Sequence, residues 1–500
     1  MKKYALLSVY DKTGIADFAK VLAGLGYEII STGGTLKVLE EAGIKVIPID
    51  EITGNPRDSF DGRMKTISFQ IESGILFDRQ NPAHVKQAEE LKIPQIDIVV
   101  CNLYPFEEKP GIETIDVGGP TMIRAAAKNY KNVLVVVDPR DYGQAFDKSK
   151  QQLAAKAFYH LSFYDSQIGK FFSNEKFPDE VTIPLRKTSV LRYGENPHQT
   201  GALYLMPKTN SPIGKLKHLW GRELSGTNIG DIYIGLETVR QFIEPAAAVM
   251  KHLSPCGIAT GKSAEEALDR AVKADPVSAF GGVIVLNKPM DLAAAKIIAT
   301  FKNEKEGNTD IVAVPEISDD ALELLKKVRK TMGVYTFGQI PTERTENWDL
   351  KYFAGAVLLQ DFDDEVESSF KDWKVVTRKK PTEKQLGQMK FGFKAVKAVR
   401  SNAVIVIDKD IPMTRGIGSG QTSRIGATKI ALEQAADLAK GGILISDSFF
   451  PFDDSVKLSA KYGIAAVVEQ GGSVQDQASI DAADGAGIPM VFTGRRAFRH

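Results

Sequence analysis

The sequence predicts an α/β protein of two to four domains, built on sheets that are covered by helices. Three observations predict this class. Strand-like and helix-like segments alternate along most of the chain. The 500 residues exceed the roughly 100 to 200 of a typical domain. Hydrophobic residues make up 43% and charged residues 25%, the composition of a folded globular protein rather than of a disordered, fibrous or membrane chain.

The N-terminal region is predicted to form a doubly wound, mostly parallel sheet with helices on both faces. Residues 4–10 form a short apolar run that is typical of a buried strand, and apolar residues from Ile15 to Leu22 then recur at helical spacing. A short helix at 35–43 ends at a glycine. The same patterns predict further strands at 27–32, 45–49, 96–105 and 132–138 and a further helix at 121–130.

Polar loops follow three of these predicted strands. They are SVYDKTG from Ser8, STGGT from Ser31 and CNLYPF from Cys101. Ligands of such sheets bind at the carboxyl ends of the strands, where free N–H groups at a helix N-terminus stabilise a phosphate. The loops therefore suggest a phosphorylated small molecule as ligand, although the same residue types also serve as ordinary helix caps.

The rest of the chain is predicted to contain two related α/β layers in tandem. A polar, proline-containing stretch at 171–201 lacks sustained periodicity, and we expect the main domain boundary between residues 150 and 190. A lysine-rich stretch at 378–385 divides the remainder again. The first layer has strands at 246–252 and 281–287 and helices at 264–274 and 291–301, and the second has strands at 402–407, 441–447 and 465–472 and a helix at 429–440.

Charge and cysteine content limit the partners and the compartment. With 64 basic and 63 acidic residues the net charge is +1, so no overall field attracts nucleic acid or an acidic membrane surface. The two cysteines, Cys101 and Cys256, argue against a disulfide framework and fit a reducing compartment. The first apolar run ends at Asp11, too early for a signal peptide, and no stretch approaches the roughly 18 apolar residues of a membrane span. We therefore expect a cytoplasmic protein.

The stretch VMKHLSPCGIATG, residues 249–261, is compatible with four kinds of chemistry. A zinc site of the deaminase type needs P-C-x-x-C and H-x-E, whereas Cys256 is followed by Gly-Ile-Ala and the chain contains no H-x-E. The proline before Cys256 and the glycine after it favour a buried, structural thiol over a nucleophile. A Schiff base at Lys251 stays open as the third alternative.

The fourth alternative is an acid/base pair formed by Lys251 and His252. A histidine that titrates near neutrality can move a proton, while a neighbouring cation stabilises an anion. Adjacent residues of a strand point to opposite faces, so these two side chains can share one pocket only if a turn begins there. We expect residues 254–257, Ser-Pro-Cys-Gly, to provide that turn.

The glycine-rich stretch GIGSGQTSR, residues 416–424, carries two interpretations. Its sixth position is Gln421 rather than the Gly or Ala of a dinucleotide fingerprint, and it has no Walker lysine. A tight turn that presents backbone N–H groups and Arg424 to an anion is one interpretation, and a plain hairpin is the other.

Many of these stretches together resemble one family. The sequence is similar to the bifunctional purine biosynthesis family, which combines a formyltransferase acting on 5-aminoimidazole-4-carboxamide ribonucleotide (AICAR) with an inosine monophosphate (IMP) cyclohydrolase. The resemblance runs in order from Ser8 to His500. It rests on SVYDKTG, STGGT, GRMKT, CNLYPF, DVGGPTMIRAAAKN, LRYGENPHQ, KHLSPCG, DPVSAFGG, SNAV, GIGSGQTSR, SDSFFPFDD and RRAFRH.

The resemblance implies a fold, two reactions and an assembly. Residues 1–185 would form a cyclohydrolase domain with a methylglyoxal-synthase-like fold. Residues 186–500 would form a transformylase of two cytidine-deaminase-like units without zinc, at about 186–378 and 379–500. The transformylase moves a formyl group from 10-formyltetrahydrofolate to the AICAR amine, and the cyclohydrolase closes formyl-AICAR to IMP with loss of water, which completes de novo synthesis of IMP. The family also implies a homodimer with shared transformylase sites and no metal in the chemistry.

For formyl transfer, the resemblance assigns Lys251 and His252 to the catalytic pair and Asn402 to orientation of the formyl group. The AICAR amine is a poor nucleophile, so its proton must leave during attack, and His252 is our candidate acceptor. Lys251 would stabilise the oxyanion or protonate the departing folate nitrogen. The nucleotide-binding set matches Arg192, Tyr193, His198, Arg424, Arg496, Phe498 and His500, and further pocket positions match Phe280, Gly281, Asp310, Phe449 and Asp454.

For ring closure, the resemblance assigns catalysis to Lys65, Tyr104, Asp116 and Lys128. A carboxylate near two lysines can shuttle protons while N–H donors hold the developing oxyanion. The surrounding nucleotide pocket matches Ser8, Asp11, Lys12, Thr32, Gly33, Gly34, Thr35, Arg63 and Thr66.

One departure from the family pattern keeps an alternative open. The family usually has His-Pro where this chain has Ser68 and Phe69. A formyltransferase whose cyclohydrolase is weakened or lost is therefore the first alternative. The second is a nucleotide-binding protein that senses purine intermediates without catalysis, although binding alone would not require the Lys251, His252 and Asn402 set.

Overall fold

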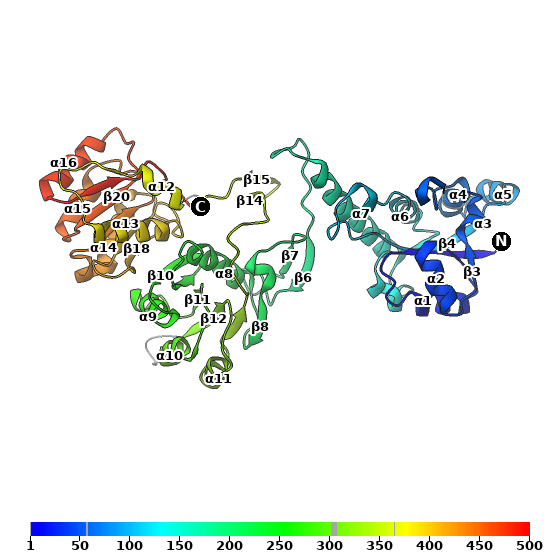
Figure 1. The fold of residues 1–500 in the computed structure, drawn as a ribbon, viewed down its shortest axis with the longest axis horizontal. Helices are drawn as coiled ribbons and strands as arrows, with labels where there is room; N and C mark the ends of the chain where they lie inside the picture. The colour runs from blue at the N-terminus through cyan, green and yellow to red at the C-terminus, as the bar shows by residue number, and fades with distance from the viewer. Residues whose placement is uncertain (1, 57–58, 302–307, 365) are drawn as a thin grey trace. The chain divides into compact units, whose positions relative to one another are not determined.

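The computed structural model describes residues 2–56, 59–301, 308–364 and 366–500, and the chain divides into two compact units (Figure 1). The first unit comprises residues 1–186 and 206–208, and the second comprises residues 187–205 and 209–500. Each unit has its own hydrophobic core.

The first unit is built on a five-stranded sheet in the order β3-β2-β1-β4-β5. Every neighbouring pair in this sheet is parallel, which confirms the predicted parallel sheet. Its strands are β1 Lys3–Val9, β2 Glu28–Ser31, β3 Val46–Pro48, β4 Gln95–Asn102 and β5 Leu134–Val136. Its helices are α1 Ile15–Gly24, α2 Gly33–Glu41, α3 Ile49–Thr53, α4 Phe69–Leu76, α5 Pro82–Glu90, α6 Gly118–Lys128 and α7 Lys150–Phe172.

The strands of this sheet are buried on both faces. Ala5, Leu6 and Leu7 are each 0% exposed although they are consecutive in β1, because helices shield both sides of a doubly wound sheet. The C-terminal part of the unit contains a helix that was not predicted, since residues 150–172, within the range 150–190 where we expected the main boundary, form the 23-residue helix α7. Ser149 and Gln152 start this helix with a reciprocal capping box.

The second unit contains two six-stranded sheets with the same scheme of strand pairing. The first sheet has the order β10-β9-β11-β12-β13-β8, and the second has the order β18-β17-β19-β20-β21-β16. Along each order the pairings are antiparallel, antiparallel, parallel, parallel and antiparallel. This match confirms the predicted tandem layers, and it shows that each sheet is mixed.

The elements of the two layers have the following bounds. The first layer has β8 Lys217–Trp220, α8 Gly226–Val239, β9 Ala246–Lys251, β10 Ser254–Thr260, α9 Ala264–Ala274, β11 Gly282–Leu286, α10 Leu292–Thr300, β12 Thr309–Val314, α11 Asp319–Val328 and β13 Gly333–Thr336. The second layer has β16 Lys374–Val375, α13 Glu383–Val396, β17 Val404–Ile407, β18 Thr414–Gly418, α14 Arg424–Ala435, β19 Ile443–Ser446, α15 Asp454–Lys461, β20 Ala466–Glu469, α16 Asp476–Ala486 and β21 Met490–Phe492. The chain also contains two small two-stranded sheets, β6 Arg186–Val190 with β7 Ala202–Leu205 and β14 Asp349–Phe353 with β15 Ala356–Gln360, and the short helix α12 Val366–Ser369.

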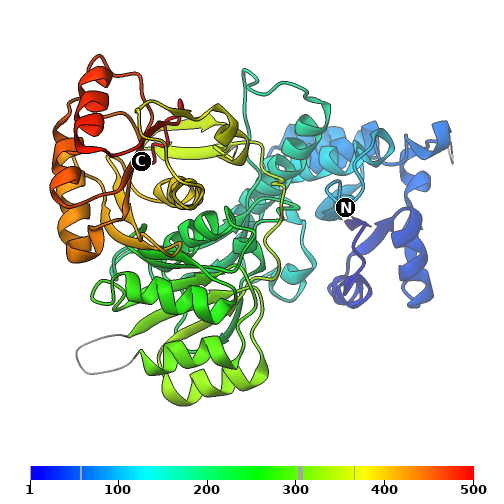
Figure 2. The ribbon, with the colours of Figure 1, turned by 60° about the vertical axis from the view of Figure 1, so that its left-hand side comes forward.

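The two layers of the second unit share one core and meet along two strand edges. Figure 2 shows the layers, green and orange to red, side by side. Phe242, just after α8, packs on Phe391 of α13 with ring centroids 5.3 Å apart. Edge strands β10 and β18 also meet, since the Ile258 N–H donates to Thr414 Oγ1 at 3.0 Å and the Thr260 N–H donates to the carbonyl of Pro412, just before β18, at 3.0 Å. Each edge strand thereby covers the other.

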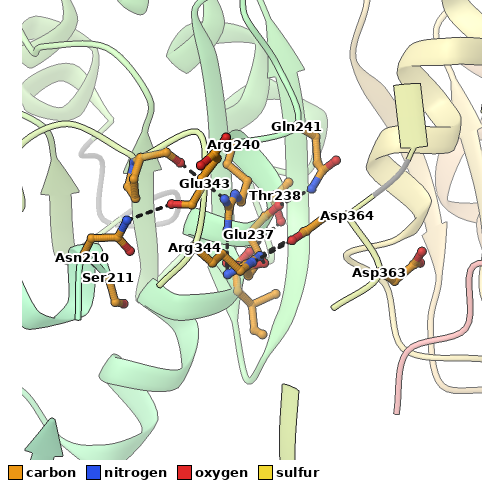
Figure 3. Close-up of polar contacts among 12 residues, drawn as sticks. Asn210, Ser211, Glu237, Thr238, Arg240, Gln241, Glu343, Arg344, Asp363 and Asp364 are labelled. Carbon is orange, nitrogen blue, oxygen red and sulfur yellow. Dashed lines mark hydrogen bonds and ion pairs between the residues drawn. The ribbon is translucent and has the colours of Figure 1, made fainter. Parts of the chain in front are cut away.

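The segment that connects the two layers is fixed to α8 by ion pairs. Arg344 donates through Nη1 to Glu237 Oε1 on α8 at 3.1 Å and through Nε to Asp364 Oδ2 at 2.8 Å (Figure 3). Asn210 adds a bond from Nδ2 to the Glu343 carbonyl at 2.8 Å. The bond to Glu237 holds the connecting chain against α8, while the bond to Asp364 lies within the connecting chain and the bond from Asn210 joins it to the stretch before β8.

Candidate functional site

Lys251 and His252 lie at the tip of a hairpin between β9 and β10. Lys251 ends β9 and pairs with Ser254 at the start of β10, so the turn consists of His252 and Leu253. Both turn residues are left-handed, with φ of 54° and 61°, as a type I′ hairpin requires. The expected turn at residues 254–257 is therefore wrong, because these residues continue as strand β10.

Two residues of α8 support this turn. The Leu253 N–H donates to Asp231 Oδ1 at 2.6 Å, and burial raises the pKa of the Asp231 carboxyl. Gly230 lets the turn approach the helix, because a Cβ there would lie 2.5 Å from Leu253 Cδ2. Neither residue was predicted, since their importance follows from contact with a turn about twenty positions away.

The side chains of the tip have different surroundings. His252 is exposed, whereas Lys251 is half-buried and donates from Nζ to the Phe280 carbonyl at 2.8 Å. This bond brings together two of the predicted site residues. Cys256 donates from Sγ to the Ser278 carbonyl at 3.4 Å, and burial raises the pKa of its thiol to about 12. Such a thiol is protonated at neutral pH, which agrees with a structural role.

Asn402 lies against the glycine-rich stretch 416–424. Its Nδ2 donates to the Gln421 carbonyl at 2.8 Å. The stretch ends β18, turns, and enters α14, whose N-terminus is capped by Ser423. The plain hairpin interpretation is therefore wrong. The helix begins at Arg424, directly after the Ser423 cap, and ends at Ala435, since the φ of Ala436 is 47°; both bounds are earlier than the predicted 429–440.

Arg424 forms a buried ion pair instead of pointing freely toward solvent. Its Nη1 donates to Asp447 and to the Ala403 carbonyl, and Asp447 also accepts from Ser401 Oγ at 2.5 Å. The Arg424 and Asp447 side chains are 6% and 0% exposed. The guanidinium carbon lies 5.9 Å from the centre of the Phe498 ring, so Arg424 lies behind the C-terminal tail.

The C-terminal tail contains three of the predicted nucleotide-binding residues. Arg496 lies over the Phe498 ring at 4.5 Å, and the Phe498 and His500 rings are 5.5 Å apart. Arg496 and His500 are exposed, so a cation and two rings face solvent next to Arg424. The structure thus brings together Arg424, Arg496, Phe498 and His500.

The other predicted pocket residues of the second unit lie on separate loops and strands. Arg192 donates to the Tyr193 hydroxyl at 2.9 Å in an exposed loop that also carries His198. Asp310 in β12 forms an ion pair with Arg222 at 2.5 Å. Gly281 is left-handed with φ of 70°, Phe449 is 36% exposed, and Asp454 is the first residue of α15.

In the first unit, the predicted loops meet at the carboxyl edge of the sheet. Lys12, in the loop after β1, lies against the start of α2, where a Cβ on Gly34 would be 3.3 Å from Lys12 Cε. Thr35 does not present a free hydroxyl, because its Oγ1 accepts the Val9 N–H at 3.0 Å and donates to the Val9 carbonyl at 2.9 Å. Ser8 lies in β1, Asp11 beside Lys12, and Thr32 and Gly33 at the N-terminus of α2.

Asn102 at the end of β4 organises the loop after β1. Its Oδ1 accepts the N–H groups of Tyr10 and Asp11 at 2.7 and 2.9 Å, and its Nδ2 donates to the Asp11 carbonyl at 3.1 Å. The CNLYPF motif contains this residue, but its residue types alone do not indicate a role for Asn102. Asn102 is a positioning residue for the loop.

Asp116 and Tyr104 are placed close together beside α6. Burial raises the pKa of Asp116, whose Oδ1 accepts the Gly119 N–H at 2.9 Å. The pKa of Tyr104 is also raised, by burial first and then by the Asp116 charge. Thr66 lies against the same turn, since a Cβ on Gly118 would be 2.2 Å from Thr66 Oγ1.

Besides Lys12, the predicted basic residues of this unit are Arg63, Lys65 and Lys128, and these three have separate surroundings. Lys65 Cε is next to Gly62, and Arg63 is exposed and paired with Glu113 at 2.5 Å. Lys128 is exposed at the far end of α6, about 15 Å along the helix from Gly118. Within one chain, the structure therefore does not bring Lys128 to Asp116.

Ser68, one of the two residues that depart from the family pattern, caps helix α4. Its Oγ accepts the Ile71 N–H at 3.1 Å, and Phe69 begins the helix with 62% of its surface exposed. The segment after Lys65 and Thr66 therefore has an ordinary helix start in place of the usual His-Pro.

Neither metal clusters nor membrane spans are found in the part of the chain that the structure describes. No three His, Cys, Asp or Glu side chains are grouped there so that they could hold a metal ion. None of the described helices is long and apolar enough to cross a membrane.

Known proteins match the whole chain. The profile described as "AICARFT/IMPCHase bienzyme" matches residues 126–434, and the profile described as "MGS-like domain" matches residues 14–135. Proteins named "Bifunctional purine biosynthesis protein PurH" from Oceanobacillus iheyensis and Clostridium botulinum are 44% identical, and one from Thermoanaerobacter sp. is 43% identical. Each of these matches covers 100% of both chains. A solved structure titled "Crystal structure of ForH" matches with 32% identity and a TM-score of 0.32, over 35% of this chain and 100% of that chain.

Proposed function

This chain belongs to the AICARFT/IMPCHase bienzyme family, and we propose that it carries out both of the reactions for which the family is named. The first is formyl transfer to AICAR, and the second is closure of formyl-AICAR to IMP. The observation that carries the proposal is identity of 44% over the full length of both chains, which includes the segments of both candidate sites.

We assign the two reactions to different parts of the chain. Residues 1–185 are proposed as the cyclohydrolase domain, which the match of an MGS-like profile to residues 14–135 supports. Residues 186–500 are proposed as the formyltransferase, with subdivisions at about 186–378 and 379–500. The division of the chain into compact units near Arg186 is compatible with this boundary.

In formyl transfer, His252 takes the proton that the AICAR amine loses as its nitrogen attacks the formyl carbon. Exposure of His252 at the hairpin tip supports this role, because the imidazole is accessible to substrate. Lys251 uses one of its three N–H donors on the Phe280 carbonyl, which leaves two for the tetrahedral oxyanion. The bond from the formyl carbon to the folate nitrogen then breaks, and that nitrogen gains a proton. Asn402 orients the formyl group.

In ring closure, the carboxamide nitrogen of formyl-AICAR attacks the formyl carbon and water leaves. Asp116 is the proposed proton shuttle, since its raised pKa makes its carboxylate a stronger base than an exposed aspartate. Tyr104 is close enough to Asp116 for the carboxylate charge to raise its pKa, and Lys65 is proposed as the nearby cation. Lys128 is included among the proposed ring-closure residues because of the family resemblance alone, since its place at the end of α6 does not bring it to Asp116 within one chain.

The formyl donor is proposed to be 10-formyltetrahydrofolate, with no metal in the chemistry, and the chain is proposed to act in the cytoplasm as a homodimer with shared transformylase sites. The β14–β15 hairpin supports self-association, because Tyr352, Phe353 and Val357 on it are 73%, 56% and 49% exposed. Cys101 and Cys256 are free thiols, which is compatible with a reducing compartment. Light scattering during size-exclusion chromatography tests the dimer.

One incubation separates the proposed function from its alternatives. Purified protein with AICAR and 10-formyltetrahydrofolate should yield IMP, with formyl-AICAR as an intermediate that chromatography resolves. Formyl-AICAR without IMP would indicate a formyltransferase alone, which the full-length similarity does not favour. Tight AICAR binding without either product would indicate a nucleotide sensor and refute the proposal.

A further inference from the structure

Arg499 in the C-terminal tail joins the two segments that carry the proposed formyl-transfer residues. Its Nη1 donates to the Leu253 carbonyl at 3.1 Å and to the Ala398 carbonyl at 2.7 Å. Leu253 is the second residue of the His252 turn, and Ala398 lies four residues before Asn402. A single guanidinium nitrogen therefore bridges the hairpin tip of one layer and the Asn402 segment of the other.

The backbone of Arg499 is fixed to the Asn402 segment as well. The Arg499 carbonyl accepts the Ser401 N–H at 2.9 Å, and the Arg499 N–H donates to Ser401 Oγ at 3.2 Å. Ser401 Oγ donates in turn to the buried Asp447 carboxylate at 2.5 Å. The base of the Arg499 side chain is thus anchored beside Asn402, and its end reaches across to the turn.

The turn needs contacts from outside its own strands. His252 and Leu253 are both left-handed, a conformation that residues other than glycine keep only where surrounding contacts impose it. Asp231 holds the Leu253 N–H, and Arg499 holds the Leu253 carbonyl. Asp231 belongs to the same layer as the turn, whereas Arg499 ties the turn to the other layer.

We propose that Arg499 is a positioning residue for formyl transfer, which fixes the placement of His252 relative to Asn402 by bonding to both segments. This inference rests on the function proposed above. Arg499 is distinct from Arg496, Phe498 and His500, because its side chain bonds to backbone carbonyls rather than facing solvent. A displacement of about 1 Å between catalytic groups and substrate lowers a rate by about 100-fold, so loss of this bridge affects the chemical step.

The test replaces Arg499 by residues that keep different parts of the contact. Arg499→Gln removes the guanidinium charge and leaves a side chain too short to bridge the two carbonyls. It should lower kcat for formyl-AICAR formation by about 100-fold with little change in the KM for AICAR. Arg499→Lys keeps a cation that can donate to one of the two carbonyls, so its kcat should fall less than that of Arg499→Gln. In Arg499→Ala, millimolar N-ethylguanidine should restore part of kcat by occupying the same site.

Arg329 provides a matched control in the same unit. It is 4% exposed, and its Nη2 donates to the carbonyls of Ile298 and Phe301 at 2.5 and 2.6 Å, neither of which belongs to the turn or the tail. Arg329→Gln should lower the urea midpoint of unfolding at least as much as Arg499→Gln and leave kcat unchanged. The three tryptophans, Trp220, Trp348 and Trp373, all lie in the second unit, so their fluorescence reports its unfolding.

A spectroscopic measurement separates this inference from the proposed function. The chain has six histidines, so the ring signals of labelled protein can be assigned with a His252→Gln variant. The His252 signal should shift or broaden in Arg499→Gln and stay unchanged in Arg329→Gln. An unchanged His252 signal, or an equal loss of kcat in both arginine variants, would overturn the positioning role. Wild-type protein that forms no formyl-AICAR would instead refute the proposed function, while the spectra would still test the contact.

Discussion

Arg424 and Asp447 form an ion pair at the carboxyl edge of the second layer, with side chains that are 6% and 0% exposed. Burial raises the pKa of Asp447, and the Arg424 charge opposes that rise. The pair joins the start of α14 to the segment after β19, and the guanidinium carbon of Arg424 lies 5.9 Å from the centre of the Phe498 ring in the C-terminal tail.

Asp447→Ala should lower the free energy of unfolding of the second unit by about 3 to 5 kcal/mol, because it leaves the Arg424 charge buried without a partner. Tryptophan fluorescence in urea measures the loss. The control is Asp410→Ala, which breaks an ion pair with Lys384 whose side chains are 56% and 59% exposed and should cost at most about 1 kcal/mol. Equal losses in the two variants would contradict the prediction.

Glu469 should make the second unit less stable as pH rises above about 5. It is 0% exposed, one oxygen accepts the Phe450 N–H, and burial raises its pKa to about 8. Between the ordinary pKa and this value the folded chain keeps a proton that the unfolded chain releases, so stability falls with rising pH by at most about 1.4 kcal/mol per unit. Glu469→Gln should flatten this dependence. If the urea midpoints of the wild type and Glu469→Gln changed with pH in the same way from pH 5.5 to 8.5, the prediction would be wrong and Glu469 would ionise normally.

His252→Ala should abolish formyl transfer and leave AICAR binding largely intact, because the imidazole is exposed and its loss removes the proposed proton acceptor. Product chromatography and calorimetric titration with AICAR measure the two effects. His218→Ala is the matched control, since His218 is also exposed and stacks on Tyr335 away from the hairpin. IMP formation from supplied formyl-AICAR should be unchanged in both variants. Normal transfer by His252→Ala would remove His252 from the mechanism.

Cys256→Ala should change kcat for formyl transfer by less than about twofold, because a thiol with a pKa of about 12 is not a nucleophile at neutral pH. Iodoacetamide at neutral pH should leave the transferase active in the wild type. A large loss of activity in Cys256→Ala, with an unchanged urea midpoint, would restore the nucleophile hypothesis.

Asn102→Ala should lower IMP formation from formyl-AICAR by about 10- to 100-fold, since the loop after β1 loses the oxygen that holds two of its N–H groups. Formyl transfer, proposed for the other unit, should not change. Asn132→Ala serves as control, because Asn132 makes side-chain bonds to Asp78 and Asn129 at the start of β5. If the two variants had equal cyclohydrolase activity, Asn102 would have no special effect on the site.

Much of the fold could be predicted from local patterns. Apolar runs identified β1, β2, β4 and β9, because a strand that is buried on both faces consists of consecutive apolar residues. Helix α7 was missed, although its capping box at Ser149 and Gln152 is visible in the sequence. The shifted bounds of α14 have the same kind of cause, since Ser423 is a cap signal that the apolar pattern alone does not include.

The candidate sites were predictable only in part. The resemblance identified Lys251, His252 and Asn402, but residue types alone left several chemistries open for the hairpin. Asp231, Asn102 and Arg499 were not predicted. Each acts through hydrogen bonds to the backbone of a distant segment, and such bonds leave no periodic or compositional signal.

By itself, the sequence determined the α/β class, the tandem layers and the membership of the chain in its family, because apolar spacing and motif order are properties of neighbouring residues. Only the tertiary structure decided that the turn is formed by His252 and Leu253, that Arg424 is paired with Asp447, and that Arg499 reaches the turn. Arg499 and Leu253 are 246 positions apart, and their contact exists only because the packing of the two layers brings a charged donor to a backbone carbonyl.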